Sequence, residues 1–318
     1  MKIMQNIRHL KPHGEENFID SYSTKAKELI TLDIKENTDF IMVGLPLSKT
    51  SISHSGASLA PEYIRDAFSN FTNYAISDQK EIKNKILDLG DIKMHPTEII
   101  QNQQAIYEGV IDVINKYPQS NFFFLGGDHS VTYSTIRAVA EKSKNIGVIQ
   151  FDAHLDLRNP KDGGPTNGTP FRRLIEDKLI KGSNLVQIGI RDFANSQIYH
   201  NFAKKNDVRT YTMEDVRKET LIEILTKELN LLSESSDEIY LSVDIDSIDQ
   251  AFAPGCTAIG PGGLTPQELL QGIDLVAKNQ KVRAIDIVEI EPTLDFRNMT
   301  SRIAVNILLY FMKGKIFG

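Results

Sequence analysis

The chain has 318 residues, 42 acidic against 36 basic side chains, a formal net charge of −6 and a single cysteine. At about 100–200 residues per domain, this length allows one large or two small domains. One cysteine excludes an internal disulfide framework and a thiolate zinc site. A pI near 5.7 without a basic cluster argues against a nucleic-acid partner. Because residues 1–17 are polar and no apolar run reaches the about 18 residues of a membrane span, we expect a cytoplasmic protein.

In chain order, eight short runs rich in Ile, Val and Phe alternate with longer amphipathic segments. The runs predicted as strands are 40–43, 86–89, 122–125, 146–151, 185–190, 208–211, 238–243 and 282–287. A predicted helix begins at Pro61, and others cover 98–115, 130–142, 196–205, 213–232, 266–278 and 301–312. This alternation predicts a doubly wound, mostly parallel α/β sheet of about eight strands. We expect a single catalytic domain over 1–318, with 1–35 as an N-terminal extension.

Acidic and histidine side chains follow three of these predicted strands. The residues are His129 after 122–125, Asp152, His154 and Asp156 after 146–151, and Asp244 and Asp246 after 238–243. Alternate residues of an extended strand end point the same way, and ligands bind beyond the carboxyl ends of parallel strands. Carboxylates this dense repel one another unless cations compensate them. A set of oxygen and imidazole donors suits Mn²⁺, with Fe²⁺, Co²⁺, Ni²⁺ and Zn²⁺ as alternatives, and six ligands suffice for two ions.

Four motifs together resemble the ureohydrolase family of arginases, agmatinases and formimidoylglutamases. They are GGDHS (126–130), FDAHLD (151–156), SVDIDSID (242–249) and VEIEP (288–292). The resemblance covers about 43–312 and implies a three-layer α/β/α fold, a homo-oligomer and two Mn²⁺ per subunit. By motif position, one ion would be held by His129, Asp152, Asp156 and Asp244, and the other by Asp152, His154, Asp244 and Asp246. Glu289 falls where the family places the carboxylate that clamps an amidine or guanidine group.

The substrate loop departs from arginases and agmatinases. Asn167 stands where those enzymes usually carry a histidine, and Arg158 stands where arginases have an uncharged residue. With the runs NGTPFRR (167–173) and SKTSISHSGAS (48–58), these departures resemble the bacterial formimidoylglutamases of histidine catabolism. N-formimidoyl-L-glutamate carries two carboxylates, which the planar fork of arginine binds well, whereas Arg158 would repel the dication agmatine. The alternative for Arg158 is a surface salt bridge.

We therefore expect hydrolysis of N-formimidoyl-L-glutamate to L-glutamate and formamide by a hydroxide held between two ions. Glu289 is predicted to hold the formimidoyl group, and Asp156 to deliver a proton to the leaving amine. His54 is a candidate proton shuttle, and Asn167 and Asn195 are candidate substrate contacts. Other possible activities are an agmatinase, an arginase or another guanidino-acid hydrolase. A non-catalytic metal- or ligand-binding protein is the alternative of a different class.

Overall fold

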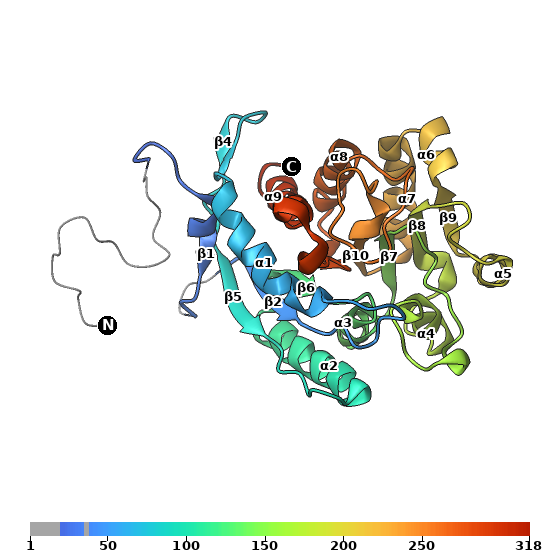
Figure 1. The fold of residues 1–318 in the computed structure, drawn as a ribbon. Coiled ribbons are helices and arrows are strands. Elements are labelled where there is room, and N and C mark those ends of the chain that lie inside the picture. The colour runs from blue at the N-terminus through green and yellow to red at the C-terminus, as the bar shows by residue number, and fades with distance from the viewer. Residues whose placement is uncertain (1–19, 35–37) are drawn as a thin grey trace.

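The computed structural model describes residues 20–34 and 38–318 (Figure 1). Nine strands of this part form one sheet in the order β1-β5-β2-β6-β11-β10-β7-β8-β9, and every neighbouring pair is parallel. The strands are β1 (Ile30–Thr31), β2 (Phe40–Leu45), β5 (Ile86–Asp91), β6 (Asn121–Gly126), β7 (Ile146–Phe151), β8 (Leu185–Ile190), β9 (Arg209–Thr212), β10 (Glu238–Asp244) and β11 (Val282–Val288). All eight predicted strands are present, which confirms the α/β class. The prediction missed β1, a two-residue edge strand whose residues are only partly buried.

The helices cover both faces of this sheet. They are α1 (Ala60–Ala67), α2 (Ile99–Lys116), α3 (Val131–Ala140), α4 (Pro170–Glu176), α5 (Gln197–Lys205), α6 (Met213–Lys218), α7 (Leu221–Ser235), α8 (Pro266–Ala277) and α9 (Met299–Phe317). A separate antiparallel pair joins β3 (Tyr74–Ala75) to β4 (Lys80–Glu81). No helix within residues 20–34 and 38–318 is both long and apolar enough to cross a membrane.

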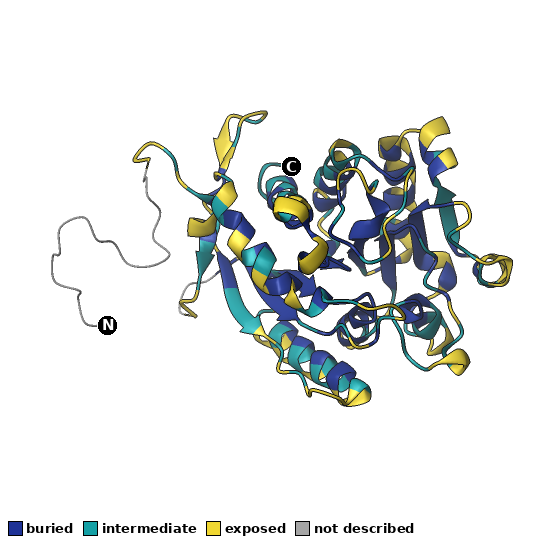
Figure 2. Ribbon diagram, viewed as in Figure 1, coloured by how far each residue is buried: buried dark blue, intermediate teal, exposed yellow. Residues whose placement is uncertain are grey.

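Alternate side chains of the strands divide between two hydrophobic cores. Phe123 and Leu125 of β6 belong to the core under α1, α6, α7, α8 and α9, whereas Phe122 and Phe124 belong to the core under α2, α3, α4 and α5. Both sheet faces are therefore buried, as the continuous apolar runs predicted. Figure 2 shows the buried sheet between helices whose outer faces are exposed. The three-layer α/β/α arrangement is thus confirmed.

One predicted helix is wrong in its extent, because 213–232 contains two helices. Thr212 and Asp215 form a reciprocal capping box at the start of α6, and Thr220 and Glu223 form another at the start of α7. The second box satisfies backbone donors that only a new helix start leaves open, so the chain breaks at Glu219 and begins again. The predicted extension over residues 1–35 falls largely on 1–19 and 35, which lie outside the described residues, and it stays a prediction.

The order of the strands explains where the polar residues meet. β6, β11, β10 and β7 are consecutive neighbours in the middle of the sheet. Because all four are parallel, their carboxyl ends open on the same edge. Three of them precede the predicted ligand motifs, and β11 precedes Glu289. The fold therefore brings four distant parts of the chain to one place.

Candidate active site

The six predicted ligands form one cluster at this edge. His129, Asp152 and Asp244 offer ligand atoms within 4.8 Å of one another, and so do Asp152, His154 and Asp246. The sixth residue, Asp156, places Oδ2 2.9 Å from Nδ1 of His129. Asp152 belongs to both groups. The bridging roles of Asp152 and Asp244 stay predictions.

Burial of neighbouring carboxylates, and the repulsion between their charges, dominate the electrostatics of this cluster. Burial raises the pKa of Asp244 well above its usual range, and the charges of Asp246 and Asp152 raise it further. Burial, followed by the charge of Asp152, raises the pKa of Asp156 to about 6. Burial works to lower the pKa of His154, but Asp246 and Asp152 outweigh it and raise that pKa to about 12. The carboxylates therefore require positive charge among them, which protons supply poorly and divalent cations supply well.

The unpaired nitrogen of His129 shows that these residues fit a metal ion. Nδ1 of this fully buried ring lies 3.1 Å from Asp152 Oδ2 and 3.2 Å from Asp244 Oδ2. It nevertheless forms no hydrogen bond within the part of the chain that the structure describes. A buried lone pair among carboxylate oxygens matches the mixed nitrogen and oxygen ligand set of Mn²⁺.

Glutamine side chains that the sequence analysis missed orient Asp152. Nε2 of Gln150 donates to Asp152 Oδ2 at 2.6 Å, and Nε2 of Gln187 donates to Gln150 Oε1 at 2.7 Å. Both glutamines are fully buried within β7 and β8. Polar residues inside otherwise apolar strands were the available signal, because a buried amide must find hydrogen-bond partners.

Arg191 and Asn195 support the loops that carry the ligands. The Arg191 guanidinium donates to the backbone oxygens of Asp246, at 2.5 Å, and of Ile248 and Gly260, both at 2.9 Å. Oδ1 of Asn195 accepts from the Leu155 N–H, and its Nδ2 donates to the backbone oxygen of Ala153. Asn195 thus spans the D-x-H-x-D segment. Its predicted contact with substrate stays a prediction.

Glu289 lies directly after β11 with its carboxylate held in one orientation. Oε1 accepts from the backbone N–H of His129 at 2.8 Å and from Nδ2 of Asn167 at 3.1 Å. Burial, followed by the charge of Asp128, raises the pKa of Glu289 to about 8. Asn167 also accepts from the Ile52 N–H through Oδ1, so it joins the 48–58 segment to Glu289.

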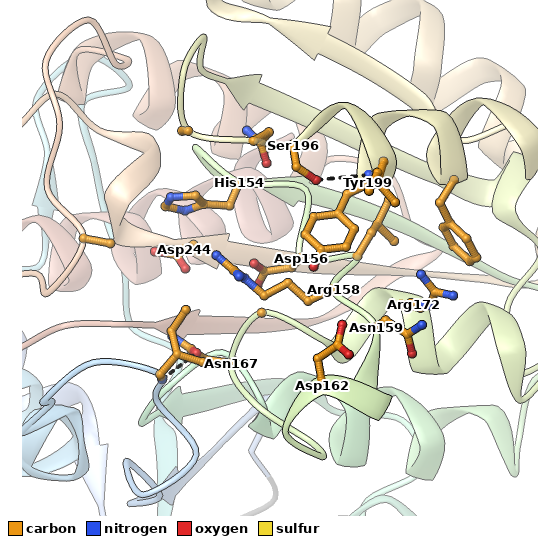
Figure 3. Close-up of a pocket in the computed structure, with 18 of the residues that line it drawn as sticks. His154, Asp156, Arg158, Asn159, Asp162, Asn167, Arg172, Ser196, Tyr199 and Asp244 are labelled. Carbon is orange, nitrogen blue, oxygen red and sulfur yellow. Dashed lines mark hydrogen bonds between the residues drawn. The ribbon is translucent and has the colours of Figure 1, made fainter.

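A cavity of about 710 Å³ opens from the ligand cluster. Its lining includes Asp244, Asp246 and Glu289 together with Arg158, Arg172, Tyr199 and Lys205. In Figure 3, His154, Asp156 and Asp244 lie toward one side of the pocket and Arg172, Asn159 and Asp162 toward the other, with Arg158 between them. The cavity therefore has an acidic inner end and an outer end that contains cations.

Comparison with known proteins identifies the family. The model described as the arginase family matches residues 38–313. The chain belongs to the arginase family. It is 49% identical over 300 residues to the formimidoylglutamase of Halalkalibacterium halodurans and 46% identical over 300 residues to that of Bacillus subtilis strain 168, with 94% of each chain covered. The solved structure of the B. subtilis formimidoylglutamase superposes with a TM-score of 0.93 at 44% identity, covering 97% of both chains.

His54 is the one predicted residue of this arginase-family site that belongs neither to the ligand cluster nor to the cavity lining among the described residues. His54 is exposed, and the described residues that line the cavity include Ile52 and Ser53 but not His54. Its proposed proton-shuttle role stays a prediction. Arg173 lies away from the cavity lining, with its guanidinium 3.5 Å from the centre of the Tyr133 ring. The lone Cys256 is buried, and burial raises the pKa of its thiol well above the usual range.

Proposed function

We propose that this protein hydrolyses N-formimidoyl-L-glutamate to L-glutamate and formamide, a reaction of histidine catabolism. Two relatives named formimidoylglutamase, at 46% and 49% identity over 94% of the chain, support this substrate. The cavity supports it independently, because it offers a carboxylate clamp for an amidine at one end and a free guanidinium for a carboxylate farther out. A cytoplasmic homo-oligomer, expected from the sequence, is part of the proposal.

The observation that carries the proposal is the placement of Arg158. Its guanidinium lies 5.9 Å from the centre of the Tyr199 ring and forms no ion pair with any described residue. An exposed arginine that lines a cavity without an acidic partner is ready to bind a carboxylate from a ligand. No acidic residue of the described ranges forms the surface salt bridge that was the alternative for Arg158, and this supports a role in binding substrate.

The Arg158 side chain packs directly against the backbone of Gly168. The Arg158 N–H donates to the Gly168 carbonyl at 2.8 Å, so the two residues are fixed to one another. A Cβ atom at residue 168 would lie 2.5 Å from Cδ and 2.9 Å from Nε of Arg158. Only glycine at residue 168 therefore leaves room for the Arg158 side chain in its present position. Because Asn167 precedes Gly168, one dipeptide contacts both Glu289 and Arg158.

At the amidine end, Glu289 is prepared to accept one hydrogen bond from the substrate. Its Oε1 already has two donors, whereas Oε2 has none among the described residues. We therefore assign Oε2 as the acceptor for a formimidoyl N–H. The two donors on Oε1 fix the carboxylate plane, so the reacting carbon is oriented before the chemistry begins.

Two Mn²⁺ per subunit complete the proposal, held by the six clustered ligands. When bound, such ions supply an activated water and stabilise the negative charge that develops on the substrate. Asp156 lines the cavity beside His129, and this position suits transfer of a proton to the leaving amine. Glu289 and Arg158 hold the two ends of the substrate meanwhile.

The test is turnover of four substrates by the Mn²⁺-loaded enzyme. N-formimidoyl-L-glutamate should yield formamide and glutamate in equal amounts, while arginine, agmatine and 4-guanidinobutyrate should yield little urea. Strong urea release without formimidoyl cleavage would instead assign an arginase, an agmatinase or another guanidino-acid hydrolase. Absence of turnover together with fewer than two bound ions would point to a non-catalytic binding protein.

A further inference from the structure

One buried carboxylate is neither a predicted ligand nor part of the cavity lining, but a single residue links it to the ligand cluster. Asp286 sits in the middle of β11 and has no exposed surface. Its Oδ1 accepts from the Ser242 hydroxyl at 2.7 Å, and its Oδ2 accepts from the hydroxyls of Thr132 at 2.7 Å and Tyr240 at 2.8 Å. Three hydroxyl donors on one buried group indicate an acceptor-only carboxylate.

The donor direction at Ser242 also determines which nitrogen of His129 carries a proton. The hydroxyl of Ser242 has a single proton, and that proton points to Asp286. The Ser242 oxygen lies 3.0 Å from Nε2 of His129 and can therefore only accept from that nitrogen. Nε2 then carries a proton, which leaves the lone pair on Nδ1, the atom that faces the carboxylates of Asp152, Asp156 and Asp244.

We propose that Asp286 is a positioning residue that acts through Ser242 to hold His129 in the tautomer whose Nδ1 binds a metal ion. The inference rests on the metal centre of the proposed function but not on the identity of the substrate. Among the described residues, the Ser242 hydroxyl oxygen is the acceptor within hydrogen-bond distance of Nε2. Outer partners of this kind change metal affinity by about 10- to 100-fold when they are removed.

Replacing Asp286 with asparagine keeps the size of the side chain. It should nevertheless reverse the hydrogen bond between residue 286 and the Ser242 hydroxyl. The amide oxygen can still accept from Thr132 and Tyr240, so its NH₂ group faces Ser242 and donates to it. The Ser242 hydroxyl then turns its proton toward Nε2 of His129. Nδ1 must carry the imidazole proton in that state and cannot bind a metal ion.

The matched control is Tyr240→Phe. This variant also removes a hydrogen bond from Asp286, at 2.8 Å, but it leaves the path from Asp286 through Ser242 to His129 intact. A role confined to packing or to general stability of β11 would make the two variants alike. A role in fixing the tautomer separates them.

The experiment measures Mn²⁺ binding by competition with a chromophoric chelator, together with the electron paramagnetic resonance spectrum of the loaded protein. We expect two ions with a magnetically coupled signal for the wild type and for Tyr240→Phe. For Asp286→Asn we expect the affinity for one ion to fall by about 10- to 100-fold, with the uncoupled six-line signal of a single Mn²⁺. Equal affinities for wild type and Asp286→Asn, or equal losses in both variants, would overturn the proposal.

If Asp286→Asn does not fold, Ser242→Ala replaces it in the comparison with Tyr240→Phe. Loss of one ion from Ser242→Ala alone supports the proposal, and full binding by Ser242→Ala overturns it. These readouts separate this proposal from the proposed function. A wild-type protein that binds two ions but does not cleave N-formimidoyl-L-glutamate would contradict only the function.

Discussion

The two ends of the cavity are built differently. The inner end comes from residues at the ends of β6, β7, β10 and β11, and most of them are buried in the middle of the sheet. The outer end comes from the loop after β7 and from α4 and α5, where Arg158 and Lys205 are exposed. Buried strand ends cannot change without disturbing the core, whereas loops can. We infer that the inner end supplies the hydrolytic chemistry and the outer end selects the substrate.

The largest expected effect is at the inner end, in Glu289→Gln. The amide keeps the size of the side chain but removes the charge that would face the amidinium. We expect kcat/KM for N-formimidoyl-L-glutamate to fall by about 10²- to 10³-fold, as for the loss of one oriented electrostatic contact in a transition state. Steady-state kinetics measure the loss, and a metal assay should still find two ions. A variant with unchanged kcat/KM would remove Glu289 from the substrate site.

At the outer end, Arg158→Ala should weaken binding more than it slows the chemistry. A hydrogen bond to a charged group contributes about 1.5–3 kcal/mol, so we expect KM to rise by about 10- to 100-fold with little change in kcat. Arg173→Ala is the matched control, because Arg173 packs over Tyr133 and donates to Gln103 instead of lining the cavity. The same KM for wild type and Arg158→Ala would contradict the inference that the outer end of the cavity selects the substrate.

A smaller effect is expected from Gly168→Ala. Its added Cβ would lie 2.5 Å from Cδ of Arg158, and a flexible side chain can move to relieve part of this clash. We expect KM to rise by about 3- to 10-fold, which corresponds to the lower part of the cost of overpacking. In the Arg158→Ala background the same change should have no further effect, because the clashing atoms are gone. Additive losses in the double variant would place the effect of Gly168 elsewhere.

The smallest effect concerns the stability of the metal-free protein. The pKa values of Asp156, Glu289 and His154 are raised in the folded state to about 6, about 8 and about 12. Because all three lie above their unfolded values of about 3.9, 4.3 and 6.5, folding favours the protonated forms. This contribution is complete below each unfolded pKa and is lost as the pH rises through each folded pKa.

Thermal unfolding of the metal-free protein should therefore occur a few degrees lower at pH 8 than at pH 5. Added Mn²⁺ should remove this difference, since the ions provide the positive charge that the protons supplied. Differential scanning calorimetry with and without chelator measures both temperatures. A metal-free protein that is more stable at pH 8 would contradict the charge conflict described for the cluster.

Much of the inner end could be predicted from the sequence, because its signals are local. Continuous apolar runs identify buried strands, and the alternation in Asp152, His154 and Asp156 indicates side chains that point one way. The break between α6 and α7 was also readable, since Thr212 and Thr220 are each followed three residues later by an acidic residue that closes a capping box.

What could not be predicted depends on contacts between distant segments. Asp286 and Ser242 are single polar residues in strands, and no local pattern tells which face they occupy, that Ser242 meets His129 or that Asp286 meets Ser242. The hydrogen bonds that join Asn167 to Glu289 and to the 48–58 segment were not predictable either, and the contact of Asn167 with substrate stays a prediction. The packing of the Arg158 side chain against Gly168 likewise depends on the folded shape of the loop and has no local signal in the sequence.

The most direct test of the account compares two substrates of the Mn²⁺-loaded enzyme under the same conditions. The division of the cavity into an amidine end and a carboxylate end predicts that kcat/KM for N-formimidoyl-L-glutamate exceeds that for agmatine by at least about 10³-fold, or about 4 kcal/mol. Formamide should be the product released. A ratio near one, or urea release from agmatine that exceeds formamide release, would contradict the central claim.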